Sequence, residues 1–338
     1  MCTAIAIRDG GLCFGRNMDV YFPINFRVTE LKMGDALSFS NGKRITLERA
    51  ILGSAAVIAN HENFGTNRKN DRTERADREG ERTPLFADAM NSSGLCMAGL
   101  DFPGYASYSP SAQAEKRNVA PYEMIAWVLS QCDTADQAEE LLRETSVMDL
   151  KFNSETPNTP LHWLIADGKR SLAVEPTERG LAVCTAESNT LTNAPDYLFH
   201  AVNLRMFGNL SAKYDPPSDH AEREGIVEKS INREKIYRPF SCGFGGIGLP
   251  GDFSSPSRFV RAAFLAENSV SDGTERGRVA QFFRVLSSVA VPNGAVLAKN
   301  GQYDLTVYSS CMDAENGKYY FLPYPSLSAP SVRAFANG

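Results

Sequence analysis

The first nineteen residues, MCTAIAIRDGGLCFGRNMD, constrain the fold more than any other stretch of this chain. Residues 2–7 form a short apolar run that is partly β-branched, residues 9–11 are a turn signal, and residues 12–15 form a second short run. Two such runs around a glycine turn predict a β-hairpin. This hairpin would bring the segment from Arg16 to Asp19 back beside Cys2.

Cys2 is a candidate nucleophile because the residue before it can be removed. Methionine aminopeptidases excise Met1 when the next residue is small, which would leave Cys2 with a thiol and a free α-amine on one Cα. A free thiol has a pKa of about 8.5 and an α-amine a pKa of about 8, so near neutral pH the amine can accept the thiol proton. No separate histidine base is then needed, and none of the 4 histidines lies in a recognisable motif.

Arg16 and Asp19 are the candidate partners of Cys2. A guanidinium near the sulfur would stabilise a thiolate, and a carboxylate would hydrogen-bond to the α-amine and orient it. In the alternative interpretation, Cys2 is an ordinary small strand residue and Arg16 and Asp19 form a surface ion pair. The hairpin by itself favours this plainer alternative.

The same stretch resembles the amino terminus of the choloylglycine hydrolase family, N-terminal nucleophile amidases that include bile salt hydrolases and penicillin V acylases. Four later segments resemble the family in the same order, and the five together span most of the chain. They are AGLDFPGYASY at residues 98–108, LHWLIADGKRSLAVE at 161–175, LTNAP at 191–195 and GLPGDFSSPSRFVRAAF at 248–264. The resemblance implies an amide hydrolase with Cys2 as its nucleophile.

Strand and helix signals predict the α+β class, and the length allows one large domain or two. The resemblance implies a single domain over residues 1–338, with the mature chain starting at Cys2. Predicted helices cover residues 121–132, 134–145, 196–207 and 276–289, and a further helix begins with Ser255 as its cap and Pro256 at its first position. Thr134 and Gln137 have the spacing of a capping box. Predicted strands include 161–166, 171–175, 181–185, 305–308 and 318–323. The resemblance implies the four-layer αββα sandwich of N-terminal nucleophile hydrolases.

Asp101 departs from the family pattern. The resemblance implies that the backbone N–H at this position helps to form the oxyanion hole, where bile salt hydrolases usually carry Asn and penicillin V acylases usually carry Tyr. A backbone donor survives any side-chain change except proline. An ionised carboxylate aimed at a developing oxyanion would cost roughly several kcal/mol. We therefore expect Asp101 to turn away, to be protonated or to pair with a cation.

Asn193 and Arg258 become candidates only through the resemblance. Judged alone, an asparagine two residues before a proline is more often a turn residue, and Arg258 fits a cation on a helix surface. The resemblance implies that the Asn193 amide donates a hydrogen bond to the oxyanion. It also implies that Arg258 organises polar groups around the nucleophile and Asp19.

Large apolar side chains near the nucleophile are the predicted substrate contacts. The segment VYFPINF at residues 20–26 is typical either of a loop that exposes aromatic rings or of one folded into the core. In the family that we infer, this loop lines the pocket for the acyl group, which favours the first interpretation. The predicted contacts are Met18, Tyr21, Phe22, Phe102 and Tyr105.

Two polar stretches are predicted to lie at the surface. Residues 66–83 are highly charged and contain no large apolar residue, so we expect an exposed loop that is an insertion relative to the family, with a lid or subunit contact as the less favoured alternative. Residues 208–246 form a long polar connection, and such connections usually have a function. The resemblance implies that this connection contacts a neighbouring subunit in a homotetramer.

Whole-chain properties exclude several classes of function. The net charge of −5 without a basic stripe argues against nucleic-acid binding. The 7 cysteines are odd in number and form no C-x-x-C pair, so we expect neither a disulfide framework nor a zinc site, and no cofactor. The apolar runs are too short to span a membrane, and no signal peptide is recognised, so we expect a cytoplasmic protein.

The leading hypothesis is a bile salt hydrolase that acts on the amide between a steroid acid and glycine or taurine through a Cys2 thioester. The alternatives are a penicillin V acylase, which is the runner-up, an acyl-homoserine lactone acylase, and an apolar-ligand binding protein of the same fold that has lost activity. The presence of Cys2, Arg16, Asp19, Asn193 and Arg258 together argues against the last of these.

Overall fold

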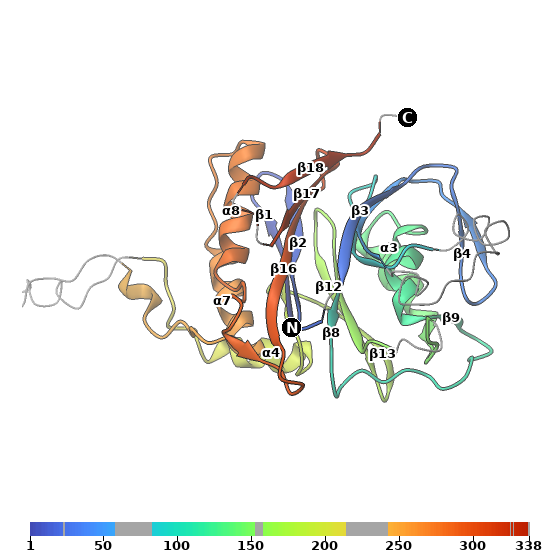
Figure 1. Cartoon of the computed structure of the whole chain (residues 1–338), viewed down its shortest axis with the longest axis horizontal. Helices are drawn as coiled ribbons and strands as arrows, with labels where there is room; N and C mark the ends of the chain where they lie inside the picture. Colours follow the sequence, from blue (N-terminus) through green and yellow to red (C-terminus); the bar gives the residue numbers. More distant parts are fainter. Residues whose placement is uncertain are drawn as a thin grey trace, which may run out of the picture.

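The computed structural model describes residues 1–22, 24–57, 83–152, 158–213, 243–324, 326 and 328–336. Two antiparallel sheets lie face to face and helices cover the outer side of each, so the order of layers is helix, sheet, sheet, helix (Figure 1). This arrangement confirms the predicted α+β class and the four-layer αββα sandwich. The amino terminus lies between the two sheets (Figure 1).

The first sheet contains the amino-terminal hairpin, which confirms the prediction from residues 2–15. Strand β1 pairs with β2 so that Cys2 lies opposite Met18 and Ala4 lies opposite Arg16. The strand order is β14-β1-β2-β16-β17-β18, with β15 paired to β16. Its strands are β1 (Cys2–Arg8), β2 (Leu12–Val20), β14 (Thr190–Leu191), β15 (Val296–Leu297), β16 (Tyr303–Asp313), β17 (Lys318–Pro323) and β18 (Ser331–Ala334).

Strand β16 is longer than the predicted strand at residues 305–308. Ser309 and Ser310 weaken the apolar pattern in the sequence, but both hydroxyls have partners inside the sheet. The Ser309 hydroxyl donates to Asn17 Oδ1 at 2.7 Å, and the Ser310 hydroxyl accepts from the Arg16 backbone N–H at 3.3 Å. Because these polar groups are satisfied, the strand continues through them.

The second sheet has the order β13-β12-β11-β8-β7-β6-β3. The predicted strands at 161–166, 171–175 and 181–185 are present. Strand β3 begins at Asn25, inside the segment 20–26 that was predicted to be a loop. The strands are β3 (Asn25–Leu31), β6 (Ile51–Val57), β7 (Phe86–Asn91), β8 (Cys96–Asp101), β11 (Leu161–Ala166), β12 (Ser171–Thr177) and β13 (Gly180–Thr185). Two small pairs lie outside it, β4 (Ala36–Ser38) with β5 (Arg44–Thr46), and β9 (Arg117–Val119) with β10 (Thr145–Val147).

Helices cover both sheets because each presents one apolar face. Helices α2 (Met124–Leu129) and α3 (Ala135–Arg143) pack on the second sheet, and the 3-10 turn η2 (Pro121–Glu123) precedes α2. Helices α7 (Ser255–Glu267) and α8 (Glu275–Ser287) pack on the first sheet, while α4 (Tyr197–Arg205) contacts α7. A short turn, η3 (Phe244–Gly246), precedes α7. Three apolar clusters result, one under each helix layer and one between the sheets.

One predicted helix cap and one predicted capping box are corrected by the structure. The cap of α7 is Ser254, whose side chain accepts from the Ser257 N–H, and not Ser255. The Ser255 hydroxyl instead bonds to Asn193, as described below. At α3, Thr134 caps Gln137 as predicted, but the Gln137 side chain accepts from the Asp133 N–H and so does not complete the capping box on Thr134.

Some predictions fall on residues outside the described ranges. The charged stretch at 66–83 lies outside them except for Thr83, and the connection at 208–246 is described only at its two ends. The six cysteines that the structure describes are free, and Cys184 is the one of them that is partly exposed. Within the described ranges, no group of His, Cys, Asp and Glu residues could hold a metal ion, and no helix has the length and apolarity to cross a membrane.

Candidate active site

The β1–β2 hairpin brings Arg16 against the sulfur of Cys2. Arg16 and Met18 are two residues apart on β2 and therefore share a face of the sheet, the face that also carries Cys2. Arg16 Nη2 lies 2.6 Å from Cys2 Sγ and 3.3 Å from Met18 Sδ. Cys2 is only 4% exposed, so the sulfur meets this guanidinium away from bulk water.

Arg16 is fully buried and is anchored from the second sheet. Its guanidinium donates to the carbonyl oxygens of Gly99 and Ala87, on β8 and β7. Burial by itself disfavours the cation, but interactions with the acidic groups nearby, Cys2, Tyr308 and Asp88, outweigh it and raise the pKa of Arg16. Arg16 is therefore a fixed positive charge beside Cys2 Sγ.

Asn193 holds the backbone of Cys2 from the opposite side. Its Oδ1 accepts from the Cys2 backbone N–H at 2.8 Å and from Arg258 Nη2 at 2.7 Å, while its Nδ2 donates to the carbonyl oxygen of Asp101 at 2.7 Å. An amide nitrogen carries two hydrogens, so one N–H remains for another acceptor. Asn193 thus links the strands that bear Cys2 and Asp101.

Arg258 reaches the same point from helix α7. Its Nη1 donates to the Cys2 carbonyl oxygen at 2.5 Å and to Thr3 Oγ1 at 2.6 Å. The side chain is fully buried and lies 4.0 Å from Asp19 Oδ2. The alternative placement of Arg258 on the helix surface is therefore wrong.

Asp19 lies on β2 near the amino terminus and is buried. The Thr306 hydroxyl donates to its Oδ1 at 2.5 Å, while its Oδ2 has no hydrogen-bond partner among the described residues. Burial raises the pKa of Asp19, and Arg258 and the terminal amine act in the opposite direction. The Met1 amine donates to the Asp19 carbonyl oxygen, at 3.1 Å, and not to its carboxylate. The hydrogen bond predicted between the Asp19 carboxylate and the amine of Cys2 is therefore not formed by the amine of Met1.

Asp101 ends strand β8 beside this group. Its carbonyl oxygen accepts from Asn193, and its side chain is partly exposed. Burial raises the pKa of Asp101, whereas the nearby terminal amine and His162 lower it. No ion pair of the Asp101 carboxylate is seen among the described residues, so the three possibilities expected for this group stay predictions.

Sequence reasoning missed Asp304, at the start of β16. Asp304 is 4% exposed, and its Oδ2 lies 2.9 Å from the Met1 amine. Its Oδ1 is buried and has no hydrogen-bond partner among the described residues. An aspartate next to a predicted strand gave no signal, because only the pairing of β16 with β2 brings it to the amino terminus.

A polar network behind Asn193 was also missed. The Asn193 carbonyl oxygen accepts from the Ser255 hydroxyl at 2.9 Å and from His200 Nε2 at 2.9 Å. His200 is fully buried and stacks on Phe259 with 4.7 Å between ring centroids. Burial lowers the pKa of His200 to about 4, so the ring is neutral at pH 7 and Nε2 is the donor. These contacts fix the Asn193 backbone.

The predicted substrate contacts divide into exposed and buried residues. Tyr21, Phe22 and Tyr105 are 42%, 46% and 47% exposed, so their rings are accessible to a ligand. Met18 is buried beside Arg16. Phe102 has no exposed surface because its ring stacks on His162, with centroids 4.2 Å apart. This corrects the prediction for Phe102, because its side chain lies in the interior and not at the surface.

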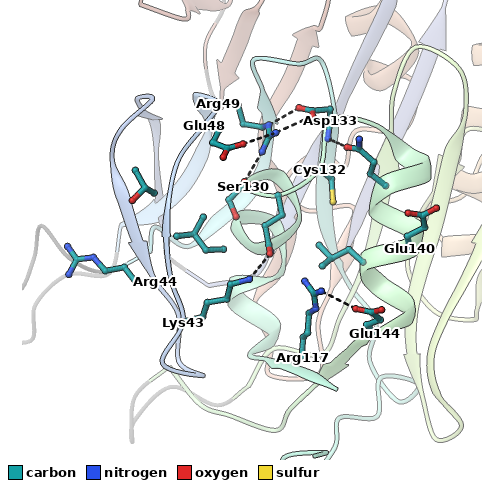
Figure 2. A pocket seen from close by; sticks show the side chains of 15 residues that line it. Lys43, Arg44, Glu48, Arg49, Arg117, Ser130, Cys132, Asp133, Glu140 and Glu144 are labelled. Atoms are coloured by element: carbon teal, nitrogen blue, oxygen red, sulfur yellow. Dashed lines mark hydrogen bonds and ion pairs between the residues drawn. The ribbon is translucent and has the colours of Figure 1, made fainter. Parts of the chain in front are cut away.

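A hollow of about 680 Å³ lies on the other side of the second sheet, between β5, α2 and α3 (Figure 2). Arg49, Arg117, Asp133 and Glu144 are among its lining residues, and Figure 2 shows ion pairs joining Arg49 to Asp133 and Arg117 to Glu144. It also contains Cys132, whose pKa burial raises to about 12. None of the predicted site residues lines this hollow.

Comparisons with known proteins agree with this geometry. A family model described as linear amide C-N hydrolases, choloylglycine hydrolase family, matches residues 2–335. The chain is 35% identical over 332 residues to a protein from Lactiplantibacillus plantarum named bile salt hydrolase/transferase, covering 98% of this chain and 92% of that one. A protein of the same name from Clostridium perfringens is 32% identical over 96% of this chain and 89% of that one.

Solved structures show the same fold. A variant of the conjugated bile acid hydrolase from Clostridium perfringens superposes with a TM-score of 0.79 at 29% identity, covering 99% of this chain and 92% of that chain. Penicillin V acylase from Agrobacterium tumefaciens superposes with a TM-score of 0.69 at 17% identity, covering 98% of this chain and 84% of that chain, a likeness of fold alone.

Proposed function

This chain belongs to the choloylglycine hydrolase family of linear amide C–N hydrolases, and we propose that it cleaves glycine- or taurine-conjugated bile acids with Cys2 as the nucleophile. The names of its relatives support the substrate. The observation that carries the mechanism is the contact of 2.6 Å between Arg16 Nη2 and Cys2 Sγ, in a site where Cys2 N also bonds to Asn193. A buried cation in contact with sulfur is the arrangement expected beside a cysteine nucleophile.

In the proposed mechanism, removal of Met1 frees the α-amine of Cys2. This amine takes the thiol proton, and the Cys2 thiolate attacks the amide carbonyl carbon, whose π electrons move to oxygen. When the tetrahedral intermediate collapses, the C–N bond breaks and the Cys2 ammonium returns the proton to the leaving amine. Water then attacks the thioester carbonyl carbon while the Cys2 amine takes one of its protons, the C–S bond breaks, and the Cys2 sulfur is freed with release of the bile acid.

The remaining residues would position these groups. The free N–H of Asn193 Nδ2 and the Asp101 backbone N–H are the proposed donors to the oxyanion. Arg258 bonds to both the Cys2 carbonyl oxygen and Asn193 Oδ1, and thereby sets the angle between nucleophile and donor. Asp19 would supply the negative charge that balances Arg258 and the Cys2 amine. Tyr21, Phe22 and Tyr105 are proposed to contact the acyl group.

A homotetramer and a cytoplasmic location are further proposals. The subunit contact would come from residues 208–246, as the family resemblance implies. A mass of four chains in light scattering after gel filtration would support this assembly, and a monomer would contradict it.

The test combines intact mass with kinetics. We expect the purified protein to lack Met1 and to release glycine and taurine from glycocholate and taurocholate faster than it cleaves penicillin V. Replacing the nucleophile with Cys2→Ser should lower kcat by about 1,000-fold or more, as loss of a nucleophile does elsewhere. Cys132→Ser is the matched control, because it changes a buried thiol outside the site.

Three results would contradict the proposal. Retention of Met1 in an active enzyme would remove the α-amine base. Turnover unaffected by Cys2→Ser would remove the nucleophile. Preferred cleavage of penicillin V would keep the mechanism but assign the substrate to the runner-up.

A further inference from the structure

The ring of His162, on β11, lies between the two segments that carry the proposed oxyanion donors, and it is fully buried. Its Nε2 lies 2.9 Å from the Thr192 carbonyl oxygen, and its face stacks on Phe102 with centroids 4.2 Å apart. Thr192 and Phe102 are the direct neighbours of the donor residues Asn193 and Asp101. One buried side chain therefore contacts both segments, and none of these contacts involves the amino-terminal amine.

Hydrogen bonds on both sides fix the orientation of the His162 ring. The Thr192 carbonyl oxygen can only accept, so Nε2 carries a hydrogen and donates it. On the other side, Nδ1 lies 3.0 Å from Glu175 Oε1. The two oxygens of Glu175 also accept from the Tyr197 N–H at the start of α4, at 3.0 and 3.2 Å. The ring is thus held at both nitrogens and on one face.

The bond from His162 Nε2 holds the peptide group that joins Thr192 to Asn193. The N–H of the same peptide group donates to the Ser255 hydroxyl at 2.9 Å, so both of its polar atoms are bonded. The Asn193 side chain follows this peptide directly, and its Nδ2 donates to the Asp101 carbonyl oxygen at 2.7 Å. Because a peptide group is planar, fixing its two polar atoms also fixes the point from which Asn193 projects.

Strand pairing sets the direction of the other donor. The Phe102 N–H donates to the Pro160 carbonyl oxygen at 2.7 Å. Successive N–H groups along a strand point to opposite sides, so the Asp101 N–H points away from β11. The His162 ring packs on the Phe102 side chain and so holds this end of β8 beside β11.

We propose that His162 is a positioning residue that sets the spacing between the two oxyanion donors, Asn193 Nδ2 and the Asp101 N–H. The inference rests on the proposed function, because these donors matter only if an oxyanion forms. A displacement of about 1 Å at a reacting centre can lower a rate about 100-fold. Since the oxyanion is absent from the bound substrate, a wrong spacing should lower kcat and leave KM nearly unchanged.

Two substitutions of His162 separate its two hydrogen bonds. The amide nitrogen of glutamine lies near the position of histidine Nε2, and that of asparagine lies near Nδ1. His162→Gln can therefore still donate to Thr192, whereas His162→Asn can donate only to Glu175. With the mature enzyme and glycocholate, we expect His162→Asn to lower kcat by about 30- to 100-fold and to keep KM within about twofold. His162→Gln should keep kcat within about fivefold of the native value, because the bond to Thr192 is retained.

Phe102→Leu tests the stacking contact. This change removes the ring but keeps the backbone and an apolar side chain, so kcat should fall by about three- to tenfold at nearly constant KM. Phe39→Leu is the matched control, because Phe39 is also buried and packs edge-on against Trp127 in the cluster under α2. The control should keep kcat within about twofold, since distant sites act independently.

Thermal unfolding shows whether each variant is folded. If a His162 variant is not, the comparison of Phe102→Leu with Phe39→Leu decides the question. A loss of kcat confined to Phe102→Leu supports the positioning role, and equal kcat in these two variants overturns it.

The other outcomes are also distinguishable. If His162→Asn is at least as active as His162→Gln, the bond to Glu175 is the important one and the proposal is wrong. A rise in KM at unchanged kcat in both His162 variants would contradict it as well. Cys2-dependent cleavage by the native enzyme would persist in either case. If the native enzyme shows no Cys2-dependent cleavage of glycocholate, the proposed function itself fails.

Discussion

Two regions of this molecule gather charged side chains around a cysteine, and they use them differently. Between the sheets, Arg16, Arg258 and Asn193 all direct polar atoms at Cys2. In the hollow beside α2 and α3, the charges bond to one another around Cys132 (Figure 2). In the hollow, Arg49 pairs with Asp133 and Arg117 pairs with Glu144, so these charges are directed at one another and not at Cys132. Contacts that meet at one residue, and not the presence of a hollow, therefore distinguish the proposed site.

The two sulfurs illustrate the same difference. Burial raises the pKa of Cys132 to about 12, and the opposing influence of Arg49 does not restore it, so Cys132 stays a thiol at neutral pH. Cys2 has a guanidinium 2.6 Å from its sulfur. The cation beside Cys2 is thus in direct contact with its sulfur, whereas Arg49, beside Cys132, is already bonded to the carboxylate of Asp133.

The largest effect expected from this comparison is on Arg16. Arg16→Met should lower kcat/KM by about 100- to 1,000-fold, the usual loss when one directed charge or donor is removed from an active site. Arg49→Met in the hollow should change kcat/KM by less than about twofold, because its carboxylate partner does not face Cys2. Steady-state kinetics of both variants test this prediction. Thermal unfolding shows whether each variant is folded. Equal losses of kcat/KM in Arg16→Met and Arg49→Met would contradict the difference proposed between the two regions.

A smaller effect is expected in the pH dependence of stability. Because the pKa of His200 is about 4 when folded and 6.5 when unfolded, the unfolded chain binds the extra proton between these values. The stability from His200 is complete above pH 6.5 and is lost as pH falls toward 4. Urea unfolding should show roughly 2 kcal/mol less stability at pH 5 than at pH 7 from this group.

A variant at His200 tests whether this residue causes the change in unfolding free energy with pH. His200→Gln keeps an N–H donor for the Asn193 carbonyl oxygen but does not titrate, so the difference between pH 7 and pH 5 should shrink. The hollow provides no comparable slope, since the lining residues that the structure describes there include no histidine. An unchanged slope in the variant would show that another group titrates.

The smallest effect belongs to the surface pair of Arg117 and Glu144. These side chains are 45% and 64% exposed, so water and salt screen their attraction. A double-mutant cycle with Arg117→Gln and Glu144→Gln should give a coupling energy of about 0.5 kcal/mol in unfolding and no change in kcat/KM. A coupling of several kcal/mol would contradict the screening of this pair by solvent.

The sequence predicted the elements whose signals are local. The hairpin was visible because its apolar runs and glycine turn lie within residues 2–15, and the α+β class followed from strands and helices with clear patterns. The four layers were predicted only through the family resemblance. Asn193 and Arg258 had no distinctive local pattern, and only the family resemblance singled them out. The structure adds that both contact Cys2. Their roles in catalysis stay predictions until the variants are measured.

Other features depended on packing that local sequence does not encode. Asp304 reaches the amino terminus only through the pairing of β16 with β2. Ser254 and Ser255 are equally good caps by residue type, and the position of Asn193 decides that Ser255 serves it and Ser254 caps α7. Phe102 looked like a ligand contact, but His162 offers its ring a buried partner.

Strand β1 has a consequence for local motion. Chain ends usually fray, but β1 is paired on both sides, with β14 at Ala4 and Ile5 and with β2 from Cys2 to Arg8. Exchange of its amide hydrogens with solvent therefore requires the first sheet to open, not just the terminus to peel away. We therefore expect the amide hydrogens of β1 to exchange as slowly as those in the middle of a sheet, and Cys2 to lose its position on heating only together with the strands around it.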